Sequence, residues 1–76
     1  MKLRLFVEDT KGFMDIYDDV NYVKITRVNN KNVLQVFLQT EKKPICILLS
    51  EVNLCYLIDL ETMHEYCRYQ KRTINF

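Results

Sequence analysis

The sequence predicts an α+β fold, a small antiparallel sheet of four to five strands with one short C-terminal helix packed on it. Apolar and polar residues alternate along several segments, as they do in half-buried strands. Near the end of the chain this alternation gives way to the spacing of one helical face. The 76 residues are too few for more than one core, so residues 1–76 are expected to form a single domain.

The first predicted element is a strand over residues 2–8. Its odd positions are apolar and its even positions are charged except for Phe6, a period of two that is typical of a half-buried strand. A turn follows at residues 9–12, which hold the only glycine of the chain, Gly12, because glycine readily adopts the positive φ of tight turns. Residues 13–19 fit either a short helix or an irregular strand, and both interpretations stay open.

The next predicted element is a β-hairpin. Residues 22–28 and 33–39 are rich in β-forming residues, and the segment between them, 29–32, holds three asparagines. Asparagine is the residue other than glycine that best tolerates the left-handed backbone of a hairpin turn. Proline cannot donate a hydrogen bond within a sheet, so Pro44 ends this part of the sheet and a new strand begins at Ile45.

A second hairpin is expected from residues 45–49 and 54–60, with its turn at Ser50 and Glu51. The rival interpretation makes Ser50 the N-cap of one helix that runs from Glu51 to about Tyr69. The even positions from 54 to 60 are all apolar, and this regular alternation favours the strand.

The last predicted element is a helix from about Met63 to Lys71. Thr62 and Glu65 have the spacing of a capping box, in which each side chain bonds the other residue's backbone N–H. Spacings of three and four residues then place four side chains on one helical face. These are Met63, Tyr66, Cys67 and Gln70. The tail, residues 72–76, fits a returning edge strand.

All three cysteines and the only histidine lie within residues 46–67, and they are predicted zinc ligands. In the second hairpin Cys46 would face Cys55, while His64 and Cys67 would share one face of the helix. Two ligands from a hairpin and two from a helix can complete a tetrahedral zinc site, which would stabilise a domain with so small a core. The alternative also stays open: the cysteines are small buried hydrophobic residues and the histidine is solvated.

Catalysis has little support in the sequence. His64 and Cys67 form the only sequence-local pair of a base and a thiol, and neighbours at this helical spacing seldom align for proton transfer. Asp15, Asp18 and Asp19 are not followed by the glycine-bearing loop of a calcium site, which favours a solvated acidic surface. One glycine cannot build a glycine-rich phosphate loop. The sequence therefore predicts a non-catalytic protein.

Composition and charge limit the partners and the compartment. Eleven Lys and Arg against ten Asp and Glu give a net charge of +1, so the chain as a whole exerts no strong field toward nucleic acid. The longest apolar run is far short of the ~20 residues that span a bilayer, and the N-terminus lacks the apolar stretch of a signal peptide. We expect a cytoplasmic protein, in which the cysteines are thiols or metal ligands.

A basic and aromatic segment near the C-terminus is a candidate nucleic-acid site. Tyr66 and Tyr69 are interleaved with Arg68, Lys71 and Arg72, and rings beside cations can hold single strands. The alternative is a solvated helix face whose cations lie favourably at the negative end of the helix dipole. Both interpretations stay open.

Binding to a larger protein is the favoured function. Five tyrosines and four phenylalanines are more than so small a core can hold, and exposed aromatic residues and arginines are enriched at protein interfaces. The sequence therefore predicts a docking surface of ordinary size. The candidate contact residues are Asp15, Asp18, Asp19, Arg68, Tyr69 and Arg72.

In its length, its near absence of glycine and proline and its lack of catalytic residues, the chain resembles the small phage-encoded inhibitors of bacterial defence. Anti-CRISPR proteins are the best-known group of these. The resemblance covers the whole chain and rests on no specific motif. It implies a protein that occupies a surface of an effector nuclease in the host cell and blocks the loading of guide or target DNA. Some members of the group carry a structural zinc, to which the set Cys46, Cys55, His64 and Cys67 would be similar.

Overall fold

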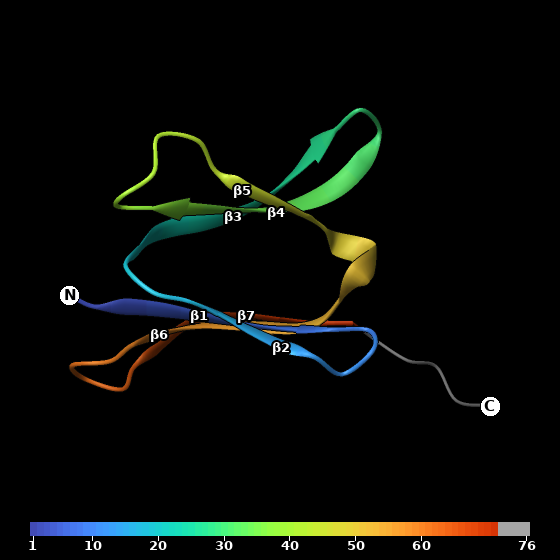
Figure 1. Ribbon diagram of the computed structural model, residues 1–76. Helices are drawn as coiled ribbons and strands as arrows, with labels where there is room; N and C mark the ends of the chain where they lie inside the picture. Colours follow the sequence, from blue (N-terminus) through green and yellow to red (C-terminus); the bar gives the residue numbers. More distant parts are fainter. Residues whose placement is uncertain (72–76) are drawn as a thin grey trace.

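The computed structural model describes residues 1–71, which form two antiparallel β-sheets packed face to face (Figure 1). The strands are β1 (Leu3–Asp9), β2 (Met14–Tyr17), β3 (Val20–Val28), β4 (Lys31–Leu38), β5 (Ile45–Leu48), β6 (Val52–Asp59) and β7 (Glu65–Gln70). The four-stranded sheet has the order β2-β1-β6-β7, and the three-stranded sheet has the order β3-β4-β5. Between β5 and β6 lies η1, one turn of 3-10 helix (Leu49–Glu51).

The core lies between the two sheets. Alternate residues of each strand point toward the opposite sheet, as the period of two requires, and the side chains of Leu5 and Val36 are 1% and 0% exposed. The core therefore draws on both sheets. Its buried cluster consists of Leu5, Val7, Val20, Leu34, Val36, Val52, Cys55 and Leu57.

The predicted first strand is confirmed as β1, and the turn after it contains the expected glycine. The Asp9 carboxylate accepts hydrogen bonds from the backbone N–H groups of Lys11, at 2.9 Å, and Phe13, at 3.0 Å. Gly12 has a φ of 90°. This turn sends the chain back antiparallel to β1, so the open choice for residues 13–19 is decided in favour of a strand, β2.

The predicted hairpin at the asparagines is confirmed as β3 and β4. Val28 pairs directly with Lys31, so the turn consists of Asn29 and Asn30 alone. These two residues have φ values of 51° and 63°. Positive φ at both central residues is typical of the two-residue turns whose twist matches that of paired strands.

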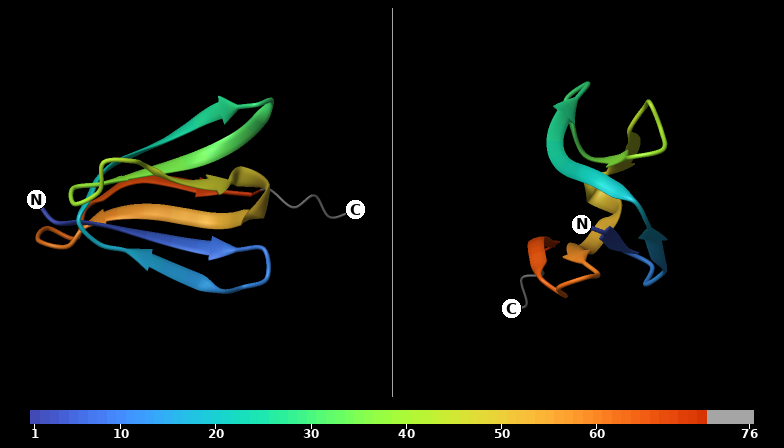
Figure 2. Two further views of the ribbon diagram at one scale, coloured as in Figure 1. Left: turned by 45° about the horizontal axis from the view of Figure 1, so that its top comes forward. Right: turned by 90° about the vertical axis from the view of Figure 1, so that its left-hand side faces the viewer.

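The predicted second hairpin is wrong, although both of its arms are strands. β5 pairs with β4, whereas β6 pairs with β1 and β7. The arms therefore belong to different sheets, and η1 carries the chain from one sheet to the other (Figure 2). Ser50 and Glu51 do not have the positive φ that a two-residue hairpin turn needs. Strand β6 also excludes the rival helix from Glu51 to Tyr69.

The predicted α+β fold is wrong because residues 65–70 form strand β7 in place of a C-terminal helix, and residues 1–71 contain seven strands in two sheets. β7 pairs with β6, for example through Tyr56 and Arg68. This pairing gives the backbone N–H and C=O groups hydrogen-bond partners and covers the edge of β6. The stabilisation from pairing outweighs the preference of a short helical pattern. Within residues 1–71 no helix has the length and apolar character needed to cross a membrane.

The segment before β7 is a turn where a helix cap was expected. The Thr62 hydroxyl oxygen accepts a hydrogen bond from the backbone N–H of His64 at 3.3 Å, which closes a local turn. Met63, between them, has a φ of 61°. The expected edge strand at residues 72–76 lies outside the described residues.

Candidate functional site

Each sheet has one face that no other layer of residues 1–71 covers, as the end view in Figure 2 shows. In the four-stranded sheet Leu5 and Leu57 belong to the core, so Phe6 and Tyr56 next to them point outward. The solvated face of an antiparallel sheet is ordinarily polar. Here its centre is apolar, which makes it the first candidate for a binding surface.

A row of side chains crosses all four strands of this face. Ile16, Phe6, Tyr56 and Arg68 are successive cross-strand partners on β2, β1, β6 and β7. The Phe6 and Tyr56 rings stack with centroids 4.9 Å apart, and the Arg68 guanidinium lies 5.1 Å from the Tyr56 centroid. Such contacts hold the side chains in a fixed arrangement. At the β2 end of the row, Ile16 is 53% exposed.

Apolar side chains widen this row on both sides. Met14 and Leu54 are the cross-strand partners of Glu8, and Ile58 is the partner of Arg4. Met14 is 46% exposed. We call the six apolar side chains of this surface the docking face. They are Phe6, Met14, Ile16, Leu54, Tyr56 and Ile58.

Two charged pairs border the docking face. Arg4 donates hydrogen bonds to both carboxylate oxygens of Asp18, at 2.6 Å and 3.2 Å, and the bond from Arg4 lowers the pKa of the Asp18 carboxyl. On β7, Nη2 of Arg68 lies 2.7 Å from a carboxylate oxygen of Glu65. Exposed pairs add little stability. They do hold both arginines around the apolar centre, as in the polar rim of a protein interface.

The three aspartates predicted as contact residues do not share one surface. Asp18 borders the docking face through its arginine partner. Asp15 lies on the other side of β2, where it is the cross-strand partner of Val7. Asp19 has a φ of 55°, and its carbonyl oxygen accepts a hydrogen bond from the backbone N–H of Gln39 at 2.9 Å. It therefore belongs to the link between the two sheets.

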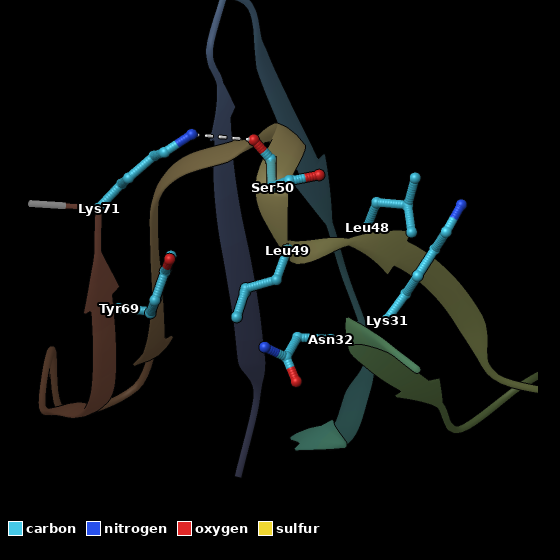
Figure 3. Close-up of a pocket in the computed structure, with 7 residues that line it drawn as sticks. All are labelled: Lys31, Asn32, Leu48, Leu49, Ser50, Tyr69 and Lys71. Carbon is cyan, nitrogen blue, oxygen red and sulfur yellow. Dashed lines mark hydrogen bonds between the residues drawn. The ribbon is translucent and has the colours of Figure 1, made fainter. Parts of the chain in front are cut away.

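The predicted basic and aromatic segment is divided by strand alternation. Arg68 points outward and completes the row of the docking face, whereas Tyr69 points inward and packs against the core. Lys71 donates a hydrogen bond from Nζ to the carbonyl oxygen of Ser50 at 3.1 Å (Figure 3). Arg72 lies outside the described residues. The segment does not form the single surface that a helix would have given it.

An open pocket of about 450 Å³ lies beside Lys71 at one end of the sandwich (Figure 3). Leu49, Tyr69 and Asn32 line it together with Lys31 and Lys71. Two lysines without a carboxylate would suit an anion if they met at one point. Figure 3 shows them on opposite sides of the pocket, with Lys31 extending away from Lys71. The pocket therefore has no convergent anion site.

The predicted zinc ligands do not lie together. Cys46 is exposed on β5, where Nε2 of Gln35 lies 3.7 Å from its sulfur. Cys55 is 5% exposed and lies in the core of the other sheet, so the predicted register that placed Cys46 opposite Cys55 is wrong. Within residues 1–71 no three His, Cys, Asp or Glu side chains are arranged to hold a metal ion. Zinc binding stays a prediction that elemental analysis of the purified protein can test.

The other two predicted ligands share no helical face. His64 lies in the turn before β7 and Cys67 lies within that strand. The imidazole meets the Tyr66 ring edge-on, with centroids 4.6 Å apart. Burial raises the pKa values of the Cys55 and Cys67 thiols, and a protonated thiol is a weak nucleophile.

Charge is divided unequally between the two sheets. Residues 20–48, which form the three-stranded sheet and its connections, hold five Lys and Arg and one acidic residue, Glu41. Residues 1–19 and 49–71 hold five Lys and Arg and nine Asp and Glu. The two parts therefore have net charges of +4 and −4, and Arg72 accounts for the total of +1. The net charge of +1 for the whole chain therefore gives no indication that the two sheets are oppositely charged.

Sequence reasoning missed the centre of the docking face. Its one local signal is Phe6, the apolar exception among the charged even positions of the first strand. The stack of Phe6 on Tyr56 depends on the register between β1 and β6, which are far apart in the sequence. A local pattern carries no information about that register.

No protein-family model, curated protein or solved structure matches the chain. What points to a function is therefore the chemistry of the two uncovered sheet faces.

Proposed function

We propose that the chain is a small, non-catalytic protein that binds a larger protein through the docking face and blocks it by steric occlusion. The observation that carries the proposal is the row from Ile16 to Arg68, which crosses every strand of an uncovered face. Aromatic residues at the centre, with arginines in charged pairs around them, are the composition of a protein interface. Tyr56 and Arg68 are of the residue types that most often dominate binding energy.

A defence nuclease of the host cell is the partner that we favour. The resemblance to small phage inhibitors of the anti-CRISPR type supports it, and so does the charge around the docking face. Residues 1–19 and 49–71 have a net charge of −4, and RNA-guided nucleases hold their nucleic acids in positively charged channels. An acidic sheet would be steered toward such a channel and would compete with the guide or target strand. The protein would act in the cytoplasm.

Inhibition of a guide-loaded effector nuclease tests the proposal. We expect an excess of the wild-type chain to slow target-DNA cleavage, and Ile16→Lys to remove the inhibition because it places a charge within the apolar docking face. Ile25→Lys is the matched control. Ile25 is 49% exposed against 53% for Ile16, and it also lies on an edge strand, but in the three-stranded sheet. This variant should inhibit as well as the wild type.

Three outcomes would contradict parts of the proposal. If the wild type slows no nuclease in a panel of guide-loaded enzymes, the nuclease is not the partner. If Ile16→Lys inhibits as strongly as the wild type, the docking face is not the binding surface. The third outcome is measured by light scattering, which gives the oligomeric state. In this outcome the wild type is a dimer and Ile16→Lys is a monomer. The face would then bind a second copy of the chain in place of a larger protein.

A further inference from the structure

The outer face of the three-stranded sheet carries a second pair of stacked rings. Tyr22 and Phe37 are cross-strand partners on β3 and β4, with ring centroids 4.3 Å apart and planes 15° apart. The Lys24 ammonium lies 5.6 Å from the Phe37 centroid. Tyr22 is 48% exposed, so its ring is accessible to a ligand.

Four further cations lie at the two ends of this sheet. Lys42 and Lys43 lie in the loop between β4 and β5, and Arg27 and Lys31 lie beside the turn of the β3–β4 hairpin. In Figure 1 this loop and the hairpin tip both rise away from the four-stranded sheet. Arg27 is the cross-strand partner of Asn32 and alternates to the core side of the sheet, so Lys31, Lys42 and Lys43 are the cations at the ends of the surface that holds the stacked rings.

These cations have no carboxylate partner within the described chain. All three ion pairs of residues 1–71 lie in the four-stranded sheet and its connections. Glu41 is the only acidic residue of the segment 20–48. We call this surface the basic face, which consists of Tyr22, Lys24 and Phe37 with Lys31, Lys42 and Lys43 at its ends. Its charge favours an anionic ligand.

We propose that the basic face binds single-stranded nucleic acid. An accessible ring can stack on an unpaired base of any kind, and the surrounding cations can contact phosphates; this combination holds single strands without sequence preference. A duplex hides the faces of its bases, so the rings favour single strands over duplex. The basic face is separate from residues 66–71, and it belongs to the sheet opposite the docking face. The inference therefore goes beyond the proposed protein partner and does not depend on it.

A tryptophan reporter tests the location of the site, because the chain contains no tryptophan. In Tyr22→Trp the indole replaces the ring of the stack, and oligo(dT) should quench its fluorescence when bases stack on it. Tyr66→Trp is the matched control, since Tyr66 has the same exposed fraction as Tyr22, 48%, but lies on β7. We expect quenching in the first variant and none in the second.

The anisotropy of labelled oligo(dT) measures the affinity. Tyr22→Ala should weaken binding at least about fivefold, the loss expected for one stacked base. The wild type should lose about 20-fold in affinity between about 50 and 200 mM salt if three phosphates are contacted. Replacing Lys42 and Lys43 by Glu should weaken binding and reduce this salt dependence. The same replacement at Lys2 and Lys11, which lie just before β1 and in the turn after it, is the control for total charge.

Three results would overturn the proposal. Quenching in Tyr66→Trp but not in Tyr22→Trp would place the site on the C-terminal segment. Equal affinity for a duplex of the same length would indicate phosphate attraction without stacking. An equal loss of affinity in both double-lysine variants would indicate a general effect of charge. A failure of this proposal can be told apart from a failure of the proposed nuclease inhibition. The inhibition is tested with Ile16→Lys, and that substitution leaves the basic face unchanged.

Discussion

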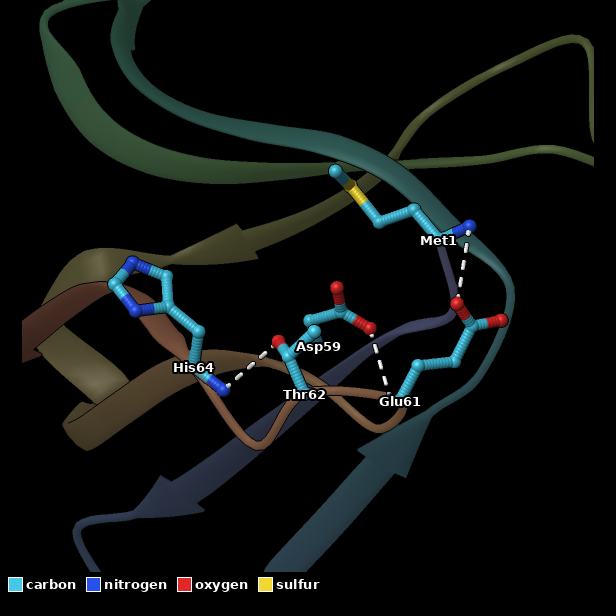
Figure 4. A network of polar contacts seen from close by, with 5 residues as sticks. All are labelled: Met1, Asp59, Glu61, Thr62 and His64. Atoms are coloured by element: carbon cyan, nitrogen blue, oxygen red, sulfur yellow. Dashed lines mark hydrogen bonds and ion pairs between the residues drawn. The ribbon is translucent and has the colours of Figure 1, made fainter.

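Among single residues, Asp59 shows most clearly how one side chain organises a turn. It is the last residue of β6, with 4% of the residue exposed, and its carboxylate accepts a hydrogen bond from the backbone N–H of Glu61 at 3.0 Å (Figure 4). That hydrogen bond is the main reason that the pKa of Asp59 lies below its ordinary value. Figure 4 shows the imidazole of His64 directed away from the carboxylate. The turn therefore depends on the carboxylate and on backbone groups.

Asp59→Asn should lower stability, and the loss should depend on pH. The folded-state pKa is depressed, so the stabilisation is present above the ordinary value of 3.8 and is lost as the pH falls through the folded-state pKa. Thermal melts followed by circular dichroism should show a lower Tm for the variant at neutral pH. The two proteins should converge toward about pH 2. A difference in Tm that is the same at both pH values would contradict this role.

The thiols should react in an order set by their burial. Cys46 is exposed, whereas Cys55 lies in the core and burial raises its pKa. Treatment with iodoacetamide at neutral pH, followed by peptide mass spectrometry, should modify Cys46 first and Cys55 only after unfolding. In denaturant the two rates should become similar. Fast modification of Cys55 in the folded protein would be inconsistent with its place in the core.

At the scale of the elements, the sequence predicts those strands whose pattern and turn are both local. Alternation is enough for β1, and the asparagines are enough for the β3–β4 hairpin. The C-terminal segment is different, because Cys67 and Tyr69 alternate with Arg68 and Gln70 while other residues of the segment also fit a helical face. Only the pairing with β6 decides between a strand and a helix, and the residues of the segment do not determine that pairing. Of the predicted contact residues, Arg68 and Asp18 lie at the docking face, the latter through Arg4.

Substitutions at Asn30 should show how much the hairpin depends on its turn. Asn30→Gly is expected to keep or raise stability, because glycine readily adopts the φ of 63° found there. Asn30→Val should lower the free energy of unfolding by about 1 to 2 kcal/mol, since a β-branched residue is strained in the left-handed region. Urea unfolding measures both. Asn32→Val, on strand β4, is the control and should have little effect.

At the scale of the whole molecule, the sequence does not show which strands share a sheet. β5 and β6 each bury an apolar face in the core, and they can do so whether they pair with each other or join different sheets. The connection between them decides which arrangement forms, and here η1 leads from one sheet to the other. The predicted contact between Cys46 and Cys55 failed for this reason. The same assignment of strands to sheets separates the charges of residues 20–48 from those of the rest of the chain.

A truncation in the core should affect both sheets at once. Leu5 is 1% exposed, and Leu5→Ala should cost about 2 to 5 kcal/mol. A domain of this size has a total stability of about 4 to 11 kcal/mol, so the variant should lose a large share of its stability and unfold at a clearly lower urea concentration. Leu54→Ala, on the docking face of β6, is the control and should lose clearly less. Urea unfolding followed by circular dichroism compares them, and equal losses would mean that the core is not between the sheets.

The opposite charges of the two sheets make each molecule an electric dipole. Packed sheets are about 10 Å apart, close to the screening length in about 0.1 M salt, so neighbouring molecules hardly sense this dipole under cellular conditions. In about 0.01 M salt the screening length reaches about 30 Å, and the positive end of one molecule can then attract the negative end of the next. Concentrated solutions near neutral pH should become turbid on dialysis into dilute buffer and clear again when salt is restored.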